Sequence, residues 1–96
     1  MYTNRRTFVI KRGHVQEALD LFATFDSDRA YRVYGSDGIA LVDFDTITAE
    51  TDFESLAEYE AYWQKAFDRS EFAEFREELN RITVPGGRNE LLKRLK

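Results

Sequence analysis

The chain has 96 residues, of which 43% are hydrophobic and 33% charged, and we expect one globular domain over residues 1–96. The absence of Cys excludes a disulfide framework and a thiolate metal site, and the single His excludes a site built from two imidazoles of one chain. The formal net charge of -4 argues against a nucleic-acid partner. Because no apolar run approaches the roughly 20 residues of a membrane span, and residues 1–6 lead into no signal peptide, we expect a cytoplasmic protein without a membrane partner.

Residues 4–10 are predicted to form a strand, with Phe8 and Ile10 on one face and Val9 on the other. A turn at residues 11–13 follows, and the hydrophobic period then changes to that of a helix. This helix is predicted to end at residues 26–28, which are rich in turn formers. Its apolar stripe consists of Val15, Ala18, Leu19, Phe22 and Phe25.

Two β-rich segments, residues 31–34 and 39–46, flank a turn at residues 35–38 (GSDG) and predict an antiparallel hairpin. The second segment is apolar on both of its faces, which indicates that both faces are covered. One face carries Ile39, Leu41, Asp43 and Asp45, and the other carries Ala40, Val42 and Phe44.

Two helices and a closing segment complete the chain. Ser55 and Glu58 have the spacing of a capping box, and Ser70 is expected to cap the next helix. Residues 84–87 (VPGG) are the clearest break. Residues 88–95 then form either a strand or a short helix, and we prefer the strand because it gives the sheet a fourth member. The two helical stripes are Leu56, Tyr59, Tyr62, Trp63, Ala66 and Phe67, and then Phe72, Phe75, Leu79 and Ile82.

The predicted order is therefore β-α-β-β-α-α-β, an α+β, ferredoxin-like fold with a four-stranded antiparallel sheet and its helices on one face. Helices of one chain cover only one face of such a sheet. Each apolar side chain left in water forfeits roughly 1.5–3 kcal/mol relative to burial. We therefore expect a homodimer through the sheet face. Two sets of residues compete for the interior: Val9, Tyr34, Val42 and Phe44, and against them Phe8, Ile10, Ile39 and Leu41.

Five segments together resemble dimeric α+β barrel proteins of the NIPSNAP-like kind. They are residues 8–15 (FVIKRGHV), 33–38 (VYGSDG), 53–62 (FESLAEYEAY), 70–75 (SEFAEF) and 87–92 (GRNELL). The resemblance implies a homodimeric barrel with a ligand cleft between sheet and helices. Relatives in this superfamily include cofactor-free monooxygenases of the antibiotic-biosynthesis type, haem-degrading enzymes and proteins without known activity.

The resemblance also suggests catalytic candidates, because the monooxygenases tend to use Asn, Trp and His or Arg in the cleft. This chain offers Asn4, Trp63, His14 and Arg88, although their spacing matches no catalytic motif. His14 is either a general base or haem ligand at the cleft mouth, or a solvent-facing residue of the first helical turn. The second interpretation is favoured, because sequence position alone sets no geometry.

The ligand-binding candidates are Tyr34, Tyr59, Trp63, Asp43 and Arg88. Tyr59, Tyr62 and Trp63 either line an aromatic pocket or belong to the core, which is the commoner role of such a stripe. Tyr31 and Tyr34 are expected on opposite faces of their strand, so only one can face the cleft.

Asp43 and Asp45 are interpreted in two ways. They form a carboxylate pair for acid–base chemistry or for a hard cation, or they belong to a strand end that emerges into solvent or pairs with arginines of the partner strand. The second interpretation is favoured. Two carboxylates are too few for Ca²⁺, and no His spacing completes a zinc site, so we expect neither a metal nor a cofactor.

Charged residues near the N-terminus form a small basic patch that is interpreted as a solvated face, although an acidic ligand is conceivable. This patch comprises Arg5, Arg6, Lys11 and Arg12. The acidic run of residues 71–78 is expected on an exposed helix face, with Arg76 and Arg81 available for local ion pairs.

Two functions remain open. The first is a small homodimeric protein that binds an apolar or aromatic small molecule, with no established chemistry. The second is a cofactor-independent monooxygenase that acts on an activated aromatic substrate. An RNA-recognition module shares the βαββαβ order, but the chain lacks its Lys/Arg-Gly-Phe/Tyr context and has the wrong charge. Haem degradation rests on His14 alone.

Overall fold

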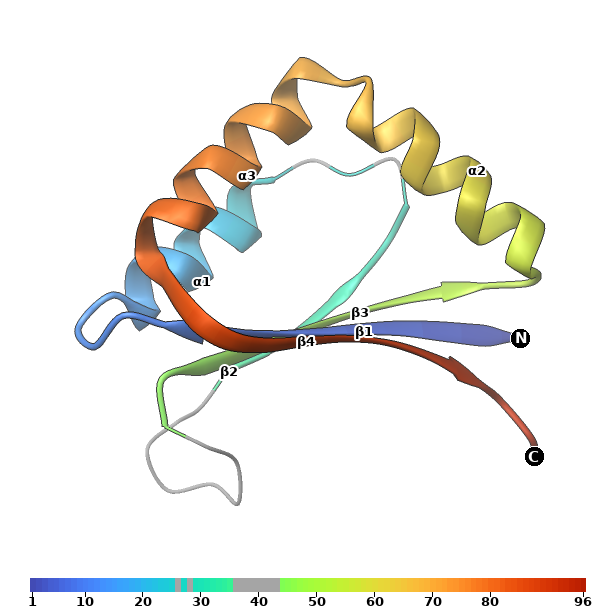
Figure 1. Ribbon diagram of the computed structural model, residues 1–96, viewed down its shortest axis with the longest axis horizontal. Coiled ribbons are helices and arrows are strands. Elements are labelled where there is room, and N and C mark those ends of the chain that lie inside the picture. The colour runs from blue at the N-terminus through green and yellow to red at the C-terminus, as the bar shows by residue number, and fades with distance from the viewer. Residues whose placement is uncertain (26, 28, 36–43) are drawn as a thin grey trace.

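A computed structural model describes residues 1–25, 27, 29–35 and 44–96. The elements follow the predicted order (Figure 1). In chain order they are β1 (Tyr2–Ile10), α1 (Val15–Thr24), β2 (Arg32–Gly35), β3 (Thr46–Phe53), α2 (Leu56–Phe67), α3 (Ser70–Ile82) and β4 (Thr83–Lys93).

The four strands form one antiparallel sheet in the order β2-β3-β1-β4. All three helices lie on one face of this sheet, and α2 and α3 meet above it in an inverted V (Figure 1). The predicted fold class, an α+β ferredoxin-like sheet with helices on one face, is therefore confirmed. The core lies between the sheet and α1 and α3, where buried residues include Ile10, Ala18, Phe22, Ile47, Phe75 and Ile82.

The period-two alternation of β1 sorts its side chains between two environments. Asn4 and Ile10 are buried under the helices, and Phe8 packs against the core from the same face. Val9 and Arg5 point to the outer face, away from the helices. In β3, Ile47, Ala49, Thr51 and Phe53 face inward and are buried.

The second arm of the predicted hairpin is displaced along the chain. The antiparallel pairing of β2 with β3 is present, but β3 begins at Thr46, and Phe44 and Asp45 lie in a turn. Residues 39–43, including Asp43, fall outside the described part. Asp45 has a left-handed φ of 57°, and its carbonyl accepts a hydrogen bond from the Ile10 N–H at 2.7 Å, so this residue closes a turn and is not part of a strand.

The helix termini show one confirmed cap and one correction. Ser55 Oγ accepts from the Glu58 N–H at 3.1 Å, and the Glu58 carboxylate in turn accepts from the Glu54 N–H at 2.7 Å, one residue before the cap. Ser70 is not a cap. It is the first helical residue of α3, and the N-cap position belongs to Arg69, whose side chain makes no capping bond.

The break expected at residues 84–87 is not a break, because β4 starts at Thr83 directly after α3 and runs through it. Pro85 is tolerated there because β4 is an edge strand, where a missing N–H costs no ladder bond on the open side. The prediction that residues 88–95 form a strand and not a helix is confirmed by β4, which ends at Lys93.

The outer sheet face differs from the apolar surface that the sequence suggests. An ion-pair network lies across its centre: Glu50 is 2.7 Å from Arg5 Nε and 3.1 Å from an Arg32 nitrogen, and Arg32 also reaches Asp52 at 2.8 Å. Exposed apolar side chains surround this network: Tyr34 on β2, and Val84 and Leu92 on β4. The outer face is therefore mixed, with a polar centre.

Candidate functional site

A cleft of about 600 Å³ lies between the sheet and the two helices α2 and α3. This volume falls within the range of small-molecule sites, roughly 300–1,000 Å³. Its lining residues come from four elements: Arg6, Thr7 and Phe8 of β1; Tyr59, Trp63 and Phe67 of α2; Phe72, Phe75, Arg76, Leu79 and Asn80 of α3; and Gly87, Arg88 and Asn89 of β4. One wall is thus an edge strand of the sheet.

Aromatic rings from the helices form the wall opposite the sheet. The centre of the Trp63 ring lies 5.7 Å from that of Phe72 and 6.1 Å from that of Phe67, and the Phe67 and Phe72 rings meet edge to face at 5.6 Å. The helical spacing places Tyr59, Trp63 and Phe67 on one side of α2. Such a wall is suited to a flat apolar molecule.

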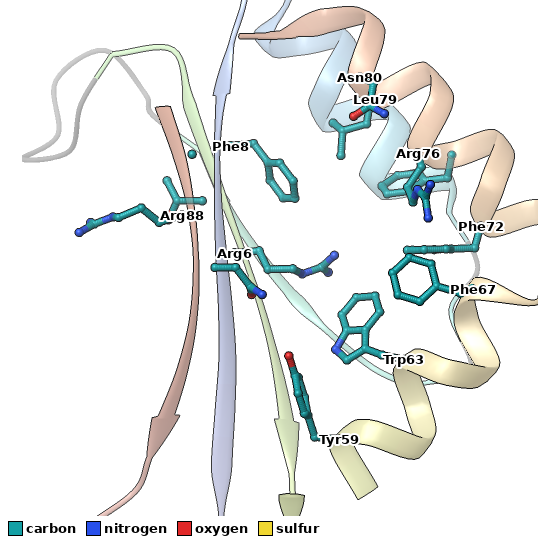
Figure 2. Close-up of a pocket in the computed structure, with 14 residues that line it drawn as sticks. Arg6, Phe8, Tyr59, Trp63, Phe67, Phe72, Arg76, Leu79, Asn80 and Arg88 are labelled. Atoms are coloured by element: carbon teal, nitrogen blue, oxygen red, sulfur yellow. The ribbon is translucent and has the colours of Figure 1, made fainter. Parts of the chain in front are cut away.

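Arg6 extends from β1 across the cleft toward this aromatic wall (Figure 2). Its guanidinium carbon lies 4.6 Å from the centre of the Trp63 ring and 5.8 Å from that of Phe8. Burial lowers the pKa of the Arg6 guanidinium, because desolvation disfavours the charged form. The group remains a cation at neutral pH.

Three enclosed polar atoms at this site have no hydrogen-bond partner among the described residues: Arg6 Nε, Trp63 Nε1 and Asn4 Oδ1. Asn4 does donate to Asn89 Oδ1 at 2.7 Å and to the Glu90 carbonyl at 2.9 Å. Buried polar groups are nearly always paired in folded proteins. A concentration of unpaired groups around one cleft therefore marks it as the functional candidate.

The structure brings only some of the sequence-predicted residues to this cleft. Trp63 and Tyr59 line it. Asn4 does not line it, but donates a hydrogen bond to Asn89, which does. Arg88 contributes to the β4 wall, but its side chain points away from the cleft (Figure 2). Tyr34 is 52% exposed on the outer face of β2, and Asp43 is outside the described residues.

His14 lies apart from the cleft. It occupies the N-cap position of α1 without making a capping bond, and its Nδ1 is 2.8 Å from a Glu17 carboxylate oxygen. Asp45 is 3.2 Å from Arg12 Nε, and because both residues lie in turns, this ion pair differs from the strand-to-strand pairing that the sequence suggests. Within the described ranges, no three His, Cys, Asp or Glu side chains gather where they could hold a metal ion. Nor is any helix there long and apolar enough to cross a membrane.

Sequence reasoning missed Arg6 and Arg76. Arg6 was assigned to a solvated basic patch, and this is wrong because it shares the inward face of β1 with Phe8 and Ile10. That alternation was the available signal. The sequence makes Arg76 available for a local ion pair with the acidic run, but its guanidinium lies 5.1 Å from the Phe67 ring centre and 5.7 Å from the Phe72 ring centre. Arg81 does pair locally, with Glu78 at 3.2 Å.

Comparison with solved structures finds the same fold in proteins of low sequence identity. An uncharacterized NIPSNAP domain protein from Burkholderia xenovorans aligns with a TM-score of 0.79 and 14% identity, over 98% of this chain and 94% of that chain. A NIPSNAP family protein from Agrobacterium tumefaciens aligns with a TM-score of 0.77 and 16% identity, over 97% and 84%. An antibiotic biosynthesis monooxygenase aligns with a TM-score of 0.71 and 14% identity, over 100% of both chains.

No protein-family model matches the chain, and no curated protein matches it. The structural matches therefore confirm the resemblance at the level of the fold, which this chain shares with NIPSNAP proteins and with an antibiotic biosynthesis monooxygenase.

Proposed function

We propose that this NIPSNAP-like chain binds a planar aromatic small molecule in the cleft between its sheet and the helices α2 and α3. The observation that carries the proposal is a cleft of about 600 Å³ whose helical wall is built from aromatic rings. Flat ligands gain both apolar burial and ring contacts in such a site.

Titration calorimetry with 2-naphthamide, a flat neutral probe, tests this function. Phe67 lines the cleft but is 59% exposed, so Phe67→Ala removes part of the binding wall with little effect on folding. We expect saturable binding by the wild-type chain and a Kd that rises about three- to tenfold in Phe67→Ala, the loss expected for one ring contact.

The matched control is Leu56→Ala, at the other end of the same helix and outside the cleft lining. This variant should bind as the wild type does. Absence of binding to the wild-type chain at millimolar probe, or equal weakening in both variants, would contradict the proposed function.

A second candidate function is cofactor-independent oxygenation of an activated aromatic substrate. It is supported by the cation of Arg6 beside Trp63, since a positive charge in a desolvated site favours the substrate anion that reacts with O₂. The shared fold with an antibiotic biosynthesis monooxygenase is consistent with it. Oxygen consumption with anthrone should then be lost in Trp63→Phe and Arg6→Met but retained in His14→Ala, whose side chain lies outside the cleft. No consumption by the wild-type chain would dismiss this candidate.

We also propose that the chain is a homodimer through its outer sheet face. The chain's own helices leave that face open (Figure 1), and Tyr34, Val84 and Leu92 are exposed on it. Burial of these side chains by a second copy would stabilise both subunits.

A further inference from the structure

Most arginines of the described chain outside the cleft pair with a carboxylate, whereas Arg94 donates a hydrogen bond to the Lys96 carbonyl. Arg5, Arg12, Arg29 and Arg32 each form an ion pair with a carboxylate. The two arginines whose side chains lie at the cleft, Arg6 and Arg76, form none with any described residue, and the Arg88 side chain points away from the cleft.

None of the described residues that line the cleft is Asp or Glu, although the whole chain carries a net charge of -4. A hollow lined by charges of one sign concentrates its electric field on the space inside. The cleft is therefore a positive site on a negative protein.

Arg6 is the most constrained of these cations. Its guanidinium lies against Trp63 and Phe8, and its buried Nε has no hydrogen-bond partner among the described residues. A partly buried cation that no described carboxylate neutralises is costly, because water solvates it incompletely. Behind Arg6 and Trp63 lies a second void of about 10 Å³, room for one water molecule at most, which cannot supply a counter-charge.

We infer that the ligand of this cleft is an aromatic carboxylate, whose acid group pairs with the Arg6 guanidinium while its flat body packs against Trp63, Phe67 and Phe72. The planar fork of a guanidinium matches the two oxygens of a carboxylate. Arg76, held at the cleft wall by the rings of Phe67 and Phe72, adds positive charge at the opening. This inference rests on the proposed binding function and names its ligand class.

The test compares two probes of the same shape, 2-naphthoate and neutral 2-naphthamide, by titration calorimetry at neutral pH. We expect naphthoate to bind at least about tenfold more tightly, the factor typical of one charge-assisted hydrogen bond. Arg6→Met should remove this preference while leaving naphthamide binding within about threefold. Acetate, which has the charge without the aromatic body, should not displace naphthoate at equal concentration.

Arg12→Met is the matched control, because it removes an arginine charge from an exposed turn outside the cleft. It should keep the preference for naphthoate. Arg6→Lys, which retains the charge but not the planar fork, should keep part of the preference and provides a second variant should Arg6→Met not fold.

The outcomes separate the two proposals. Equal binding of naphthoate and naphthamide by the wild-type chain overturns the carboxylate inference and leaves the cleft as a neutral aromatic site. A preference that persists in Arg6→Met, or effective displacement by acetate, also overturns it. No binding of either probe overturns the proposed function itself.

Discussion

Arg6 is a cation held between aromatic rings, and two opposing effects determine what it contributes to stability. Contact of a guanidinium with an aromatic face stabilises by up to about 2 kcal/mol, whereas desolvation of an unpaired ion costs several kcal/mol. Because Arg6 is partly exposed to water, it bears only part of this desolvation cost, which still exceeds the stabilisation by the ring contact. Arg6 therefore has the character of a functional residue that the fold tolerates at a cost.

Replacing Arg6 with Met should accordingly raise the free energy of unfolding by about 1 kcal/mol, because Met keeps an apolar contact with Trp63 and Phe8 and removes the enclosed charge. Urea unfolding of the variant and the wild type measures this difference. If the free energy of unfolding of Arg6→Met is instead lower than that of the wild type by more than about 1 kcal/mol, the cation contributes to folding, which would contradict this account of the site.

Asp52 on the outer face has a pKa lowered to about 2 from an ordinary value of 3.8, chiefly because Arg32 donates hydrogen bonds to it. A carboxyl whose pKa is lower in the folded state stabilises the fold at pH above its unfolded value. That contribution is lost as the pH falls from about 4 through about 2.

The stability of Asp52→Asn should therefore depend less on pH than that of the wild type between about pH 4 and pH 2, and the variant should be the less stable of the two at pH 7. Thermal unfolding across this range measures the effect. Asp68→Asn, at the exposed end of α2, is the control and should retain the wild-type slope. An unchanged slope in Asp52→Asn would show that the Arg32 pairing is not maintained in solution.

At the scale of elements, the pairing of β4 with β1 sets the edge wall of the cleft. The register shifts between Thr7 and Val9, opposite residues 84–88. A Cβ added at Gly87 would lie 2.5 Å from the Thr7 carbonyl oxygen, which is closer than real Cβ atoms approach backbone atoms. Glycine at this position therefore allows the two strands to approach at the irregularity.

Gly87→Ala should destabilise the chain by about 1–3 kcal/mol, because backbone atoms must separate to admit the methyl group. Gly35→Ala is a useful comparison, since the three atoms nearest to its Cβ would all belong to the Leu19 side chain, the nearest at 3.2 Å, and this side chain can move. Urea unfolding should show a larger decrease in the free energy of unfolding for Gly87→Ala than for Gly35→Ala. An equal decrease in both variants would indicate that β4 adjusts freely at the register shift.

The elements that sequence alone predicts are those with one clear buried face. The stripes of α1, α2 and α3 repeat every three or four residues because only one side of each helix meets the sheet. The strand β3 was placed too early, because the apolar run at residues 39–44 is more hydrophobic than the alternation of Ile47, Ala49, Thr51 and Phe53 that defines the strand.

The sequence offers Trp63 and Tyr59 as ligand-binding candidates, with the core as the favoured alternative, because aromatic rings on successive helical turns share one side. Both side chains line the cleft. Arg6 is not among these candidates, because a charged residue is ordinarily exposed and only its alternation with Phe8 and Ile10 indicates otherwise. That no described carboxylate pairs with Arg6 is a tertiary property, which no local sequence pattern indicates.

For the molecule as a whole, the outer sheet face is the surface through which we propose that two chains associate. We expect sedimentation equilibrium at micromolar concentration to give a mass of twice the 11.3 kDa of the chain. Tyr34→Glu places a charge among the exposed apolar residues of that face and should shift the mass toward one chain. Leu56→Glu, exposed on α2 on the helical side, should not. A single-chain mass for the wild type would contradict the proposed dimer.

Ligand binding in the cleft can be followed through the indole signal of Trp63, because Trp63 is the single Trp of the chain and lines the cleft. A ¹H–¹⁵N spectrum therefore contains one indole signal, from the Nε1–H beside Arg6. The most direct measurement is a titration of the labelled chain with 2-naphthoate at neutral pH. We predict that this signal moves saturably while the amide signals of Glu50 and Asp52 on the outer face stay in place. An indole signal that stays fixed at millimolar naphthoate would contradict the assignment of the cleft as the ligand site.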